Sequence, residues 1–301
     1  DDDEKPAAKK DDDDEKKDDD EKPAAKKDDD DEKKDDDEKP GAPPPSDDSA
    51  SVSALEVEAG LRAVHRSFDY HDTPAQLFPG QLSSLPSYTL PLGPAFYIDG
   101  TIYPLAFSSN GAAANFGITG SYETLFATKS VYQEGTPNEV QYTTHSSQFF
   151  VGLRGRIPVA AHEFGLVAGY GQHAFTLVGG DPAQPNFPDV SYKFIRLNAD
   201  ARLHFDDLTL GFHLGTRLVN SVGSIKSGYW FPNAKAQSIE GGASVGYALS
   251  RRFDVVVGVD LLRYAFDFNP IPDNMTPSLV AGGAVDQYIS GSLGLRYTFR
   301  N

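Results

Sequence analysis

The most constraining feature of this chain is a two-residue alternation that fills its last segment, residues 285–301. An extended strand turns successive side chains to opposite faces. One face of this segment carries Val285, Ile289, Leu293, Leu295, Tyr297 and Phe299. The other face carries Asp286, Ser290, Ser292, Gly294, Arg296 and Thr298. The run is longer than an ordinary half-buried strand and ends in aromatic residues. This is typical of a membrane β-strand with lipid on one side and a polar lumen on the other.

The same alternation recurs along the chain. Nine further stretches show it, at residues 54–63, 92–107, 113–127, 140–157, 162–177, 195–205, 208–218, 239–249 and 253–261. The pattern predicts an all-β protein, a transmembrane up-and-down antiparallel β-barrel of about ten strands. Eight or twelve strands stay open, because Pro94 and Pro104 lie within one stretch and Asp99-Gly100 could turn a hairpin there.

The connections between these stretches alternate in length. Short ones are expected near residues 108–111, 158–161, 206–207 and 250–251, and long ones near 71–91, 128–139, 178–189, 220–235 and 268–282. Outer-membrane barrels have short periplasmic turns and longer outer loops, so both termini are predicted to be periplasmic. At the periplasmic depth, the lipid face is expected to carry an aromatic girdle made of Phe205, Tyr247, Phe253, Tyr297 and Phe299.

The N-terminal segment has a different composition. Residues 1–17 read DDDEKPAAKKDDDDEKK, residues 18–34 repeat them word for word, and residues 35–39 begin a third copy. Residues 1–50 hold 24 of the 44 acidic residues and 11 of the 27 basic ones, so most of the formal charge of −17 belongs to this segment. No apolar side chain in the repeat is larger than alanine, so the repeat has nothing to bury and is predicted to be disordered.

Two regions are therefore predicted. Residues 1–53 form an acidic repeat and a proline-rich linker on the periplasmic side, and residues 54–301 form the barrel. The repeat is interpreted as a solvated spacer, with loose binding of cations or of a partner as the alternative.

Composition excludes several classes of protein. No run of 18 apolar residues exists, so the sequence offers no transmembrane helix. No basic cluster with interleaved aromatic residues points to nucleic acid. The chain has no cysteine and no histidine cluster with zinc spacing, so no metal or cofactor is predicted and no catalytic residue is assigned.

Three segments carry a family resemblance. They are residues 102–107 (IYPLAF), residues 169–175 (GYGQHAF) and residues 295–299 (LRYTF). The region 54–301 resembles bacterial outer-membrane β-barrel proteins, and most of all the small, poorly characterised barrel domains of proteobacteria such as myxobacteria. The resemblance implies contact with outer-membrane lipid and lipopolysaccharide, and insertion by the barrel-assembly machinery. Phe299 is third from the end, whereas the assembly signal of the family usually places its aromatic residue last.

The polar faces of the strands carry many charged residues. The predicted lumen-lining network contains Glu163, Arg196, Asp200, Arg202, Arg217, Glu240, Asp260 and Arg296, and further inward charges are Glu56, Glu58, Arg62, Arg154, Asp254 and Asp286. A barrel of about ten strands leaves a narrow interior that side chains can fill. The charges are interpreted first as a mixed-sign salt-bridge network that closes the lumen, and second as the lining of a narrow solute path. Their near balance of sign argues against a strongly selective pore.

The leading functional hypothesis is a non-enzymatic envelope anchor or scaffold, whose residues 1–50 reach a periplasmic protein or the cell wall. A narrow passive channel or small-solute transporter is the alternative. A third interpretation comes from a resemblance to the omptin proteases, ten-stranded enzymes with acidic residues and a His–Asp pair at the outer rim. It would use His173 and His213, with Asp260 or Asp181 as the orienting carboxylate.

Three adjacent aromatic residues, Tyr229, Trp230 and Phe231, fall in one of the long loops. Exposed aromatic residues in a loop are candidates for contact with a partner or ligand. The alternative is that the three rings pack on neighbouring loops or form a second girdle at the outer interface.

Overall fold

The computed structural model describes residues 53–73, 76, 85, 87–132, 140–179, 187–270 and 280–300. The predicted tail lies outside the described residues except for Ser53, so its disorder stays a prediction. Large parts of four predicted long loops also lie outside them, and so does Asp181.

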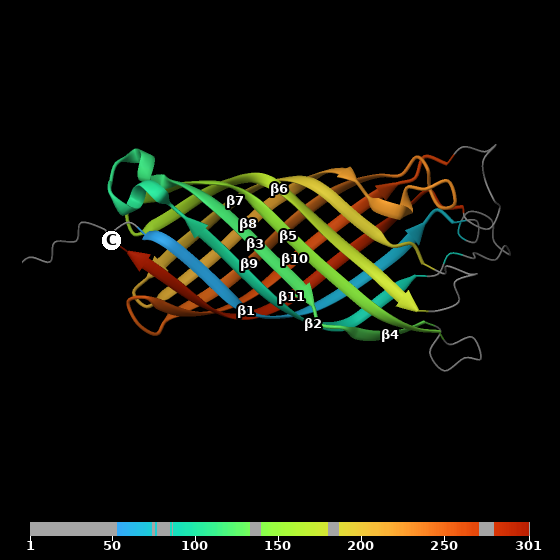
Figure 1. Cartoon of the computed structure of the whole chain (residues 1–301), viewed down its shortest axis with the longest axis horizontal. Coiled ribbons are helices and arrows are strands. Elements are labelled where there is room, and N and C mark those ends of the chain that lie inside the picture. Colours follow the sequence, from blue (N-terminus) through green and yellow to red (C-terminus); the bar gives the residue numbers. More distant parts are fainter. Residues whose placement is uncertain are drawn as a thin grey trace, which may run out of the picture. The chain divides into compact units, whose positions relative to one another are not determined.

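The described residues form eleven strands of one antiparallel sheet. These are β1 (Ser53–His71), β2 (Tyr88–Ile102), β3 (Phe116–Leu125), β4 (Thr128–Tyr132), β5 (Val140–Val159), β6 (His162–Gly179), β7 (Val190–Phe205), β8 (Leu208–Ser221), β9 (Lys235–Ala248), β10 (Phe253–Asp267) and β11 (Gly283–Arg300). Consecutive strands are hydrogen-bonded to each other, except that β3 pairs with β5 and not with β4, and Figure 1 shows the strands running obliquely around a barrel.

The sheet closes on itself because β1 pairs with both β2 and β11. The strands β3 and β4 both pair with β5, so they share one position in the wall. The part of the chain that the structure describes is therefore a closed barrel of ten strand positions, and the prediction of about ten is confirmed. Closure leaves no sheet edge whose amide groups would face hydrocarbon without partners.

The prediction of a strand over residues 92–107 is wrong for residues 103–107. The strand β2 runs straight through Asp99 and Gly100, which pair with Glu58 and Val57, so no hairpin forms there. It ends at Ile102, and two 3₁₀ helices follow, η1 (Pro104–Phe107) and η2 (Ala112–Asn115). Pro104 lacks the N–H that the ladder would need, and its fixed φ suits the first turn of a helix. The connection expected near 108–111 is therefore longer and spans residues 103–115.

The two ends of the barrel differ. One end carries the connection 103–115 and the short turns at residues 160–161, 206–207 and 249–252. Ser53 pairs with Arg300 at this end, so the first and last strands begin and finish there. We call it the turn-side rim. The opposite end, the loop-side rim, carries the longer connections, as the alternation in length predicts.

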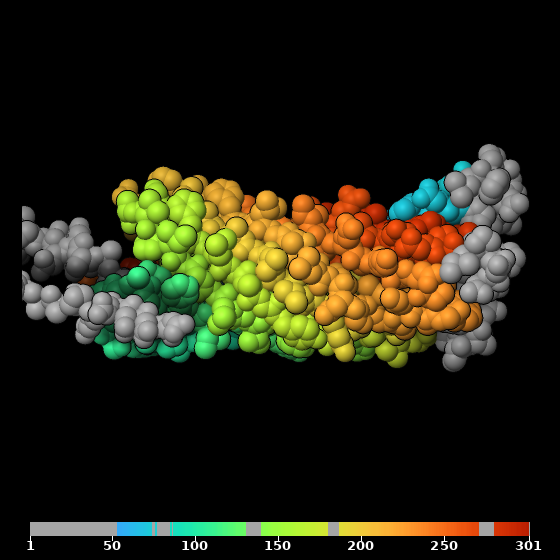
Figure 2. All heavy atoms as spheres, turned by 90° about the horizontal axis from the view of Figure 1, so that it is seen from above, coloured from blue at the N-terminus to red at the C-terminus, as the bar shows by residue number. Residues whose placement is uncertain are grey.

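A band of exposed apolar side chains surrounds the barrel. Large apolar residues on the outer faces of the strands keep 37–68% of their surface exposed, among them Leu61, Phe116, Leu153, Leu166, Leu214, Val257 and Leu293. On β7 the band runs ten residue steps from Ile195 to Phe205. At about 3.3 Å per step and a tilt of about 40°, this projects to about 25 Å, the height of the lipid-facing band of outer-membrane barrels. In the space-filling view, neighbouring strands form one continuous wall (Figure 2).

The strands continue past this band toward the loop-side rim. On β1 the outward residues change from Ala63 to His65, Ser67 and Asp69, and on β10 Leu261 is followed outward by Arg263. Crossing a bilayer takes about 9–11 tilted residues, whereas most of these strands are longer. The loop-side part of the barrel, which we call the extension, therefore stands beyond the apolar band. Among the described residues, no helix has the length and hydropathy needed to span a bilayer.

The lipid band makes a direct prediction about β10. We expect Val257→Arg, an outward substitution in mid-band, to lower the free energy of unfolding by about 2–4 kcal/mol, because a guanidinium must enter hydrocarbon. The matched control is Ala265→Arg, an exposed outward residue on the same strand beyond Arg263, with an expected loss of about 0–1 kcal/mol. Denaturant unfolding in lipid bilayers measures both. Equal losses for the two variants would contradict the position of the band.

Candidate functional site

The lumen is the candidate site, and it has three layers. An aromatic layer fills the extension near the loop-side rim, a polar cavity lies below it, and a cluster of charged residues lies near the turn-side rim. We call these the plug, the central cavity and the rim cluster.

The plug is built from inward-facing rings of strands on all sides of the barrel. Its largest members are buried: Phe68, Tyr88, Phe175, Tyr192, Phe194, Tyr264, Phe266 and Phe268. Tyr192 of β7 stacks on Tyr264 of β10 with ring centres 3.8 Å apart. Tyr88 of β2 meets Phe175 of β6 at 5.7 Å. These contacts join strands that are not neighbours in the sheet, so the rings fill the cross-section of the extension.

An ion pair lies inside the plug. The Arg66 guanidinium donates two hydrogen bonds to Asp286, of 2.7 and 2.9 Å, and both side chains have no exposed surface. Asp286 also accepts hydrogen bonds from the hydroxyls of Tyr192 and Tyr288. The guanidinium carbon lies 3.7 Å from the ring centre of Phe175 across the barrel. Buried charges are tolerated where such partners satisfy them. Nη1 of Arg66 is the exception, because it has no hydrogen-bond partner among the described residues.

Arg66 was not among the residues that the sequence singled out. Its signal was available, because Arg66 follows Glu56, Glu58 and Arg62 on the inward face of β1. The alternation was followed only to residue 63, and the partner Asp286 lies 220 positions further along the chain.

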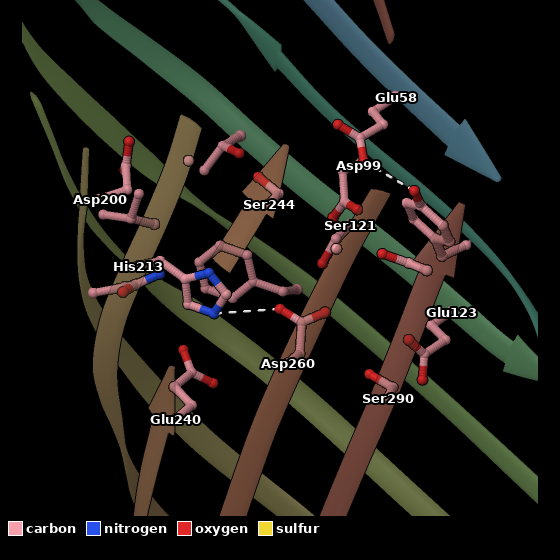
Figure 3. Close-up of a pocket in the computed structure, with 18 of the residues that line it drawn as sticks. Glu58, Asp99, Ser121, Glu123, Asp200, His213, Glu240, Ser244, Asp260 and Ser290 are labelled. Atoms are coloured by element: carbon pink, nitrogen blue, oxygen red, sulfur yellow. Dashed lines mark hydrogen bonds and ion pairs between the residues drawn. The ribbon is translucent and has the colours of Figure 1, made fainter. Parts of the chain in front are cut away.

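The central cavity has a volume of about 330 Å³, and many charged side chains line it beside apolar ones. Arg62 bridges Glu123 of β3 and Asp260 of β10. Arg296 holds Glu58 at 2.7 Å, and Glu240 lies between Arg196 and Arg217, with Arg217 Nε at 2.6 Å. Figure 3 shows Glu58, Asp99, Glu123 and Asp260 gathered around the space. Carboxylates and arginines therefore alternate around the wall rather than forming a ring of one sign.

The rim cluster links opposite walls of the barrel. Glu56 of β1 forms an ion pair with Arg202 of β7, and these two strands are separated by four strand positions in either direction around the barrel. Arg154 contacts Glu163 at 2.8 Å and also pairs with Asp200. Arg154 also donates a hydrogen bond to the hydroxyl of Tyr103, a buried residue of the connection 103–115. The cluster narrows the lumen at this level.

The residues of the predicted network all face the lumen. Seven of the eight line the central cavity: Arg196, Asp200, Arg202, Arg217, Glu240, Asp260 and Arg296. Glu163 lies in the rim cluster, where it contacts Arg154 and lies 3.9 Å from Arg202. The structure brings the predicted residues together in ion pairs of mixed sign.

The two candidate histidines have different surroundings. His213 Nε2 lies 3.6 Å from Asp260 Oδ1, and Figure 3 shows the ring directed at this carboxylate. His173 is 3% exposed, and its Nε2 lies 3.3 Å from the hydroxyl of Ser146. Its ring packs against Tyr288 at 4.7 Å. Of the two candidate histidines, His213 is the one paired with a carboxylate, and it lies inside the barrel below the plug.

A Gly-x-Ser-x-Gly motif at residues 242–246 was also overlooked in the sequence. It lies within β9, and Ser244 lines the central cavity. A nucleophile elbow needs a sharp strand-to-helix turn, whereas this segment pairs regularly with β8 and β10. In the described part of the chain, no group of three or more histidine, aspartate or glutamate residues could hold a metal ion.

The predicted girdle residues lie at the turn-side end of the apolar band. Phe253 and Tyr297 are cross-strand partners with ring centres 5.2 Å apart. Tyr247 pairs with Leu208, and Phe205 lies beside His162 at 5.8 Å. Phe299 stacks on Phe107 of η1 at 5.9 Å. Phe107 was not predicted as part of this row, because it was assigned to a strand.

The three loop aromatics separate. Phe231 is buried and stacks on Phe268 of the plug with ring centres 3.7 Å apart. Trp230 packs partly against the same core. Tyr229 is 59% exposed. Phe231 is therefore not available as an exposed contact residue, and the prediction of a partner contact is left to Tyr229 and to the edge of Trp230.

Comparisons with known proteins give no family and no activity for this chain. No protein-family model and no curated protein matches it. Among solved structures, it is similar to the outer membrane protease OmpT from Escherichia coli, with 12% identity, a TM-score of 0.47, and coverage of 81% of this chain and 96% of that one. It is also similar to Neisserial surface protein A, with 12% identity, a TM-score of 0.30, and coverage of 82% of this chain and 98% of that one. A FadL homologue from Pseudomonas aeruginosa has 10% identity, a TM-score of 0.33, and coverage of 82% of this chain and 90% of that one. These likenesses are too weak to carry a residue role.

The closed ladder and the apolar exterior decide the class of fold. The chain folds as an outer-membrane β-barrel. Within that class, the plugged extension and the charged lumen are the features from which a function must be argued.

The ion pair in the plug makes a prediction. We expect Arg66→Met to lower the free energy of unfolding by about 3–5 kcal/mol, because Asp286 is left buried without its cation. The double variant Arg66→Met with Asp286→Leu is expected to recover most of the loss, because it removes both charges. Denaturant unfolding of the reconstituted barrel measures both variants.

The matched control for this prediction is Asp72→Asn, which alters the exposed pair of His71 and Asp72 at the same end of the barrel. Its expected effect is within about 0.5 kcal/mol, as for most surface substitutions. A double variant as unstable as the single one would show that the pair itself stabilises the fold.

Proposed function

We propose that this protein is a closed, non-enzymatic anchor or scaffold of the bacterial outer membrane, with both termini in the periplasm. The observation that carries the proposal is the plug. Its rings and the Arg66–Asp286 pair have almost no exposed surface, so water does not reach this level of the lumen through the described residues. Contact with lipid and lipopolysaccharide, and insertion by the barrel-assembly machinery, belong to the same proposal.

The channel alternative rests on the central cavity. Its volume of about 330 Å³ and its charged wall would suit a small polar solute. A conducting path needs a continuous aqueous route, however, and apolar constrictions stop conduction by excluding water. Phe175, Tyr192 and Tyr264 form such a constriction above the cavity. The plug therefore favours the anchor over the channel.

The enzyme alternative rests on His213 and Asp260. Their 3.6 Å contact has the geometry of a weakly oriented base, and it lies in a lumen covered by the plug on the loop side. A protein substrate approaching from outside would have to displace the plug first. This arrangement supports a non-enzymatic role.

The closed lumen predicts the electrical behaviour of the barrel. In planar bilayers the unaltered protein is expected to give no single-channel steps. Cutting the plug by the combined substitutions Phe68→Ala, Phe175→Ala and Tyr264→Ala is expected to produce steps, because it removes three buried rings from the lumen. The matched control, Phe149→Ala, Tyr170→Ala and Phe212→Ala, removes three rings from the lipid face and is expected to stay silent. Steps from the unaltered protein would favour the channel.

The tether is tested separately. Deleting residues 1–50 is expected to leave the barrel inserted and to abolish crosslinking of the protein to a periplasmic protein or to the cell wall in intact cells, because the acidic repeat supplies the contact. A control of equal length, with the Asp, Glu and Lys residues of 1–39 replaced by Ser and Gly, asks whether charge is needed. Crosslinks that survive the deletion unchanged would refute the tether.

A further inference from the structure

The connection between β2 and β3, residues 103–115, is longer than the other turns at the turn-side rim. The turns at residues 206–207 and 249–252 contain two aspartates and two arginines, respectively, and the turn at residues 160–161 is Ala-Ala. Residues 103–115 contain no charged side chain, although residues 51–301 hold 20 acidic and 16 basic residues. Their exposed surface is uncharged: Leu105 is 50% exposed and Phe107 is 43% exposed, beside the exposed polar residues Ser108, Ser109 and Asn110. Figure 1 shows the two helical turns bulging outward at the end of the barrel.

The connection is fixed to the rim and is not a loose loop. Tyr103, Ala106 and Ala114 are buried in a small core with Ala54. Arg156 of β5 donates hydrogen bonds of 3.1 Å to the side chain of Asn115 and to the carbonyl of Ala114. Its guanidinium lies 3.7 Å from the ring centre of Tyr103. One face of the connection is thus packed against the barrel, so the orientation of its exposed face relative to the barrel is fixed.

The exposed face is continuous with the lipid-facing band. Leu55 is paired with Ile102 on one side and with Phe299 on the other, so these three outward residues form one row around the barrel. Phe107 stacks on Phe299 at the end of this row, with ring planes 25° apart. Leu105 and Phe107 therefore extend the row at the depth where the aromatic girdle meets the membrane surface.

We propose that residues 104–113 form an interfacial foot, which lies in the leaflet surface at the turn-side rim and inserts Leu105 and Phe107 among the lipid chains. The occupant of this surface is lipid, because the segment is uncharged, continues the apolar band and is held against it by Phe299. The foot fixes the depth of the barrel in the bilayer at this point. The inference holds whether the barrel is an anchor or a channel.

Fluorescence quenching tests the foot. Trp230 is the only tryptophan, so Trp230→Phe gives a silent background. Single-tryptophan variants L105W and F107W are reconstituted in phosphatidylcholine vesicles with or without bromine on the upper acyl chain. We expect bromine to reduce their emission roughly twofold or more, because the rings lie at the interface. F205W, at a lipid-facing position, is the positive reference.

The matched control is D207W, in an exposed turn at the same rim. It is expected to keep its emission in brominated lipid and to lose it to aqueous iodide. L105W and F107W behaving like D207W would overturn the foot, and this surface would then face water and be open to a protein partner. Quenching of F205W and of the two foot variants, with D207W unaffected, supports the proposal.

Discussion

Everything in this structure depends on the hydrogen-bonded seam between β1 and β11. The seam joins the first strand to the last along their whole length, from Ser53 and Arg300 to His71 and Gly283. An open edge in hydrocarbon would leave amide groups unpaired at a cost of several kcal/mol each. In a closed barrel every second residue must point into the lumen, so the inner and outer faces of each strand are fixed. The charged lumen is therefore a consequence of the seam and of the two-residue period together.

The polarity of the wall inverts along the barrel. In the lipid band, β1 places Leu55 and Leu61 outside and Glu56 and Arg62 inside. In the extension it places His65 and Asp69 outside, with Phe68 and Tyr70 inside. The period of two persists, and only the solvent on the outside changes. Water around the extension makes a buried apolar interior favourable there, as in a soluble sandwich. The thickness of the membrane therefore sets the level along the barrel at which the plug begins.

This inversion explains which parts were predictable. The alternation of residues 195–218 correctly predicted β7 and β8 and which side chains face outward. In this band nearly every second residue is apolar and faces lipid, so the two-residue period assigns the faces without ambiguity. The plug was missed because the prediction assigned apolar residues to the outer face throughout. On β1 this assignment fails near residue 64, beyond which the apolar residues face the lumen. The connection 103–115 was expected only near 108–111, because it contains no polar marker of a turn before Ser108. Inward charges were predicted, but their partners were not, because Glu56 and Arg202 lie 146 positions apart and meet only across a closed barrel.

The Arg66–Asp286 pair is best understood through the register of the seam. A slip of one residue would turn charged residues toward lipid, but a slip of two keeps every side chain on its own face, so alternation alone does not select the register. A two-residue slip moves β11 along β1 by about 6–7 Å. The bidentate contact at 2.7 and 2.9 Å cannot survive that displacement, and two charges would be left unpaired among aromatic rings. An apolar pair of equal volume would pack as stably but would discriminate less between registers. The pair therefore contributes more to selecting the seam than to stabilising it.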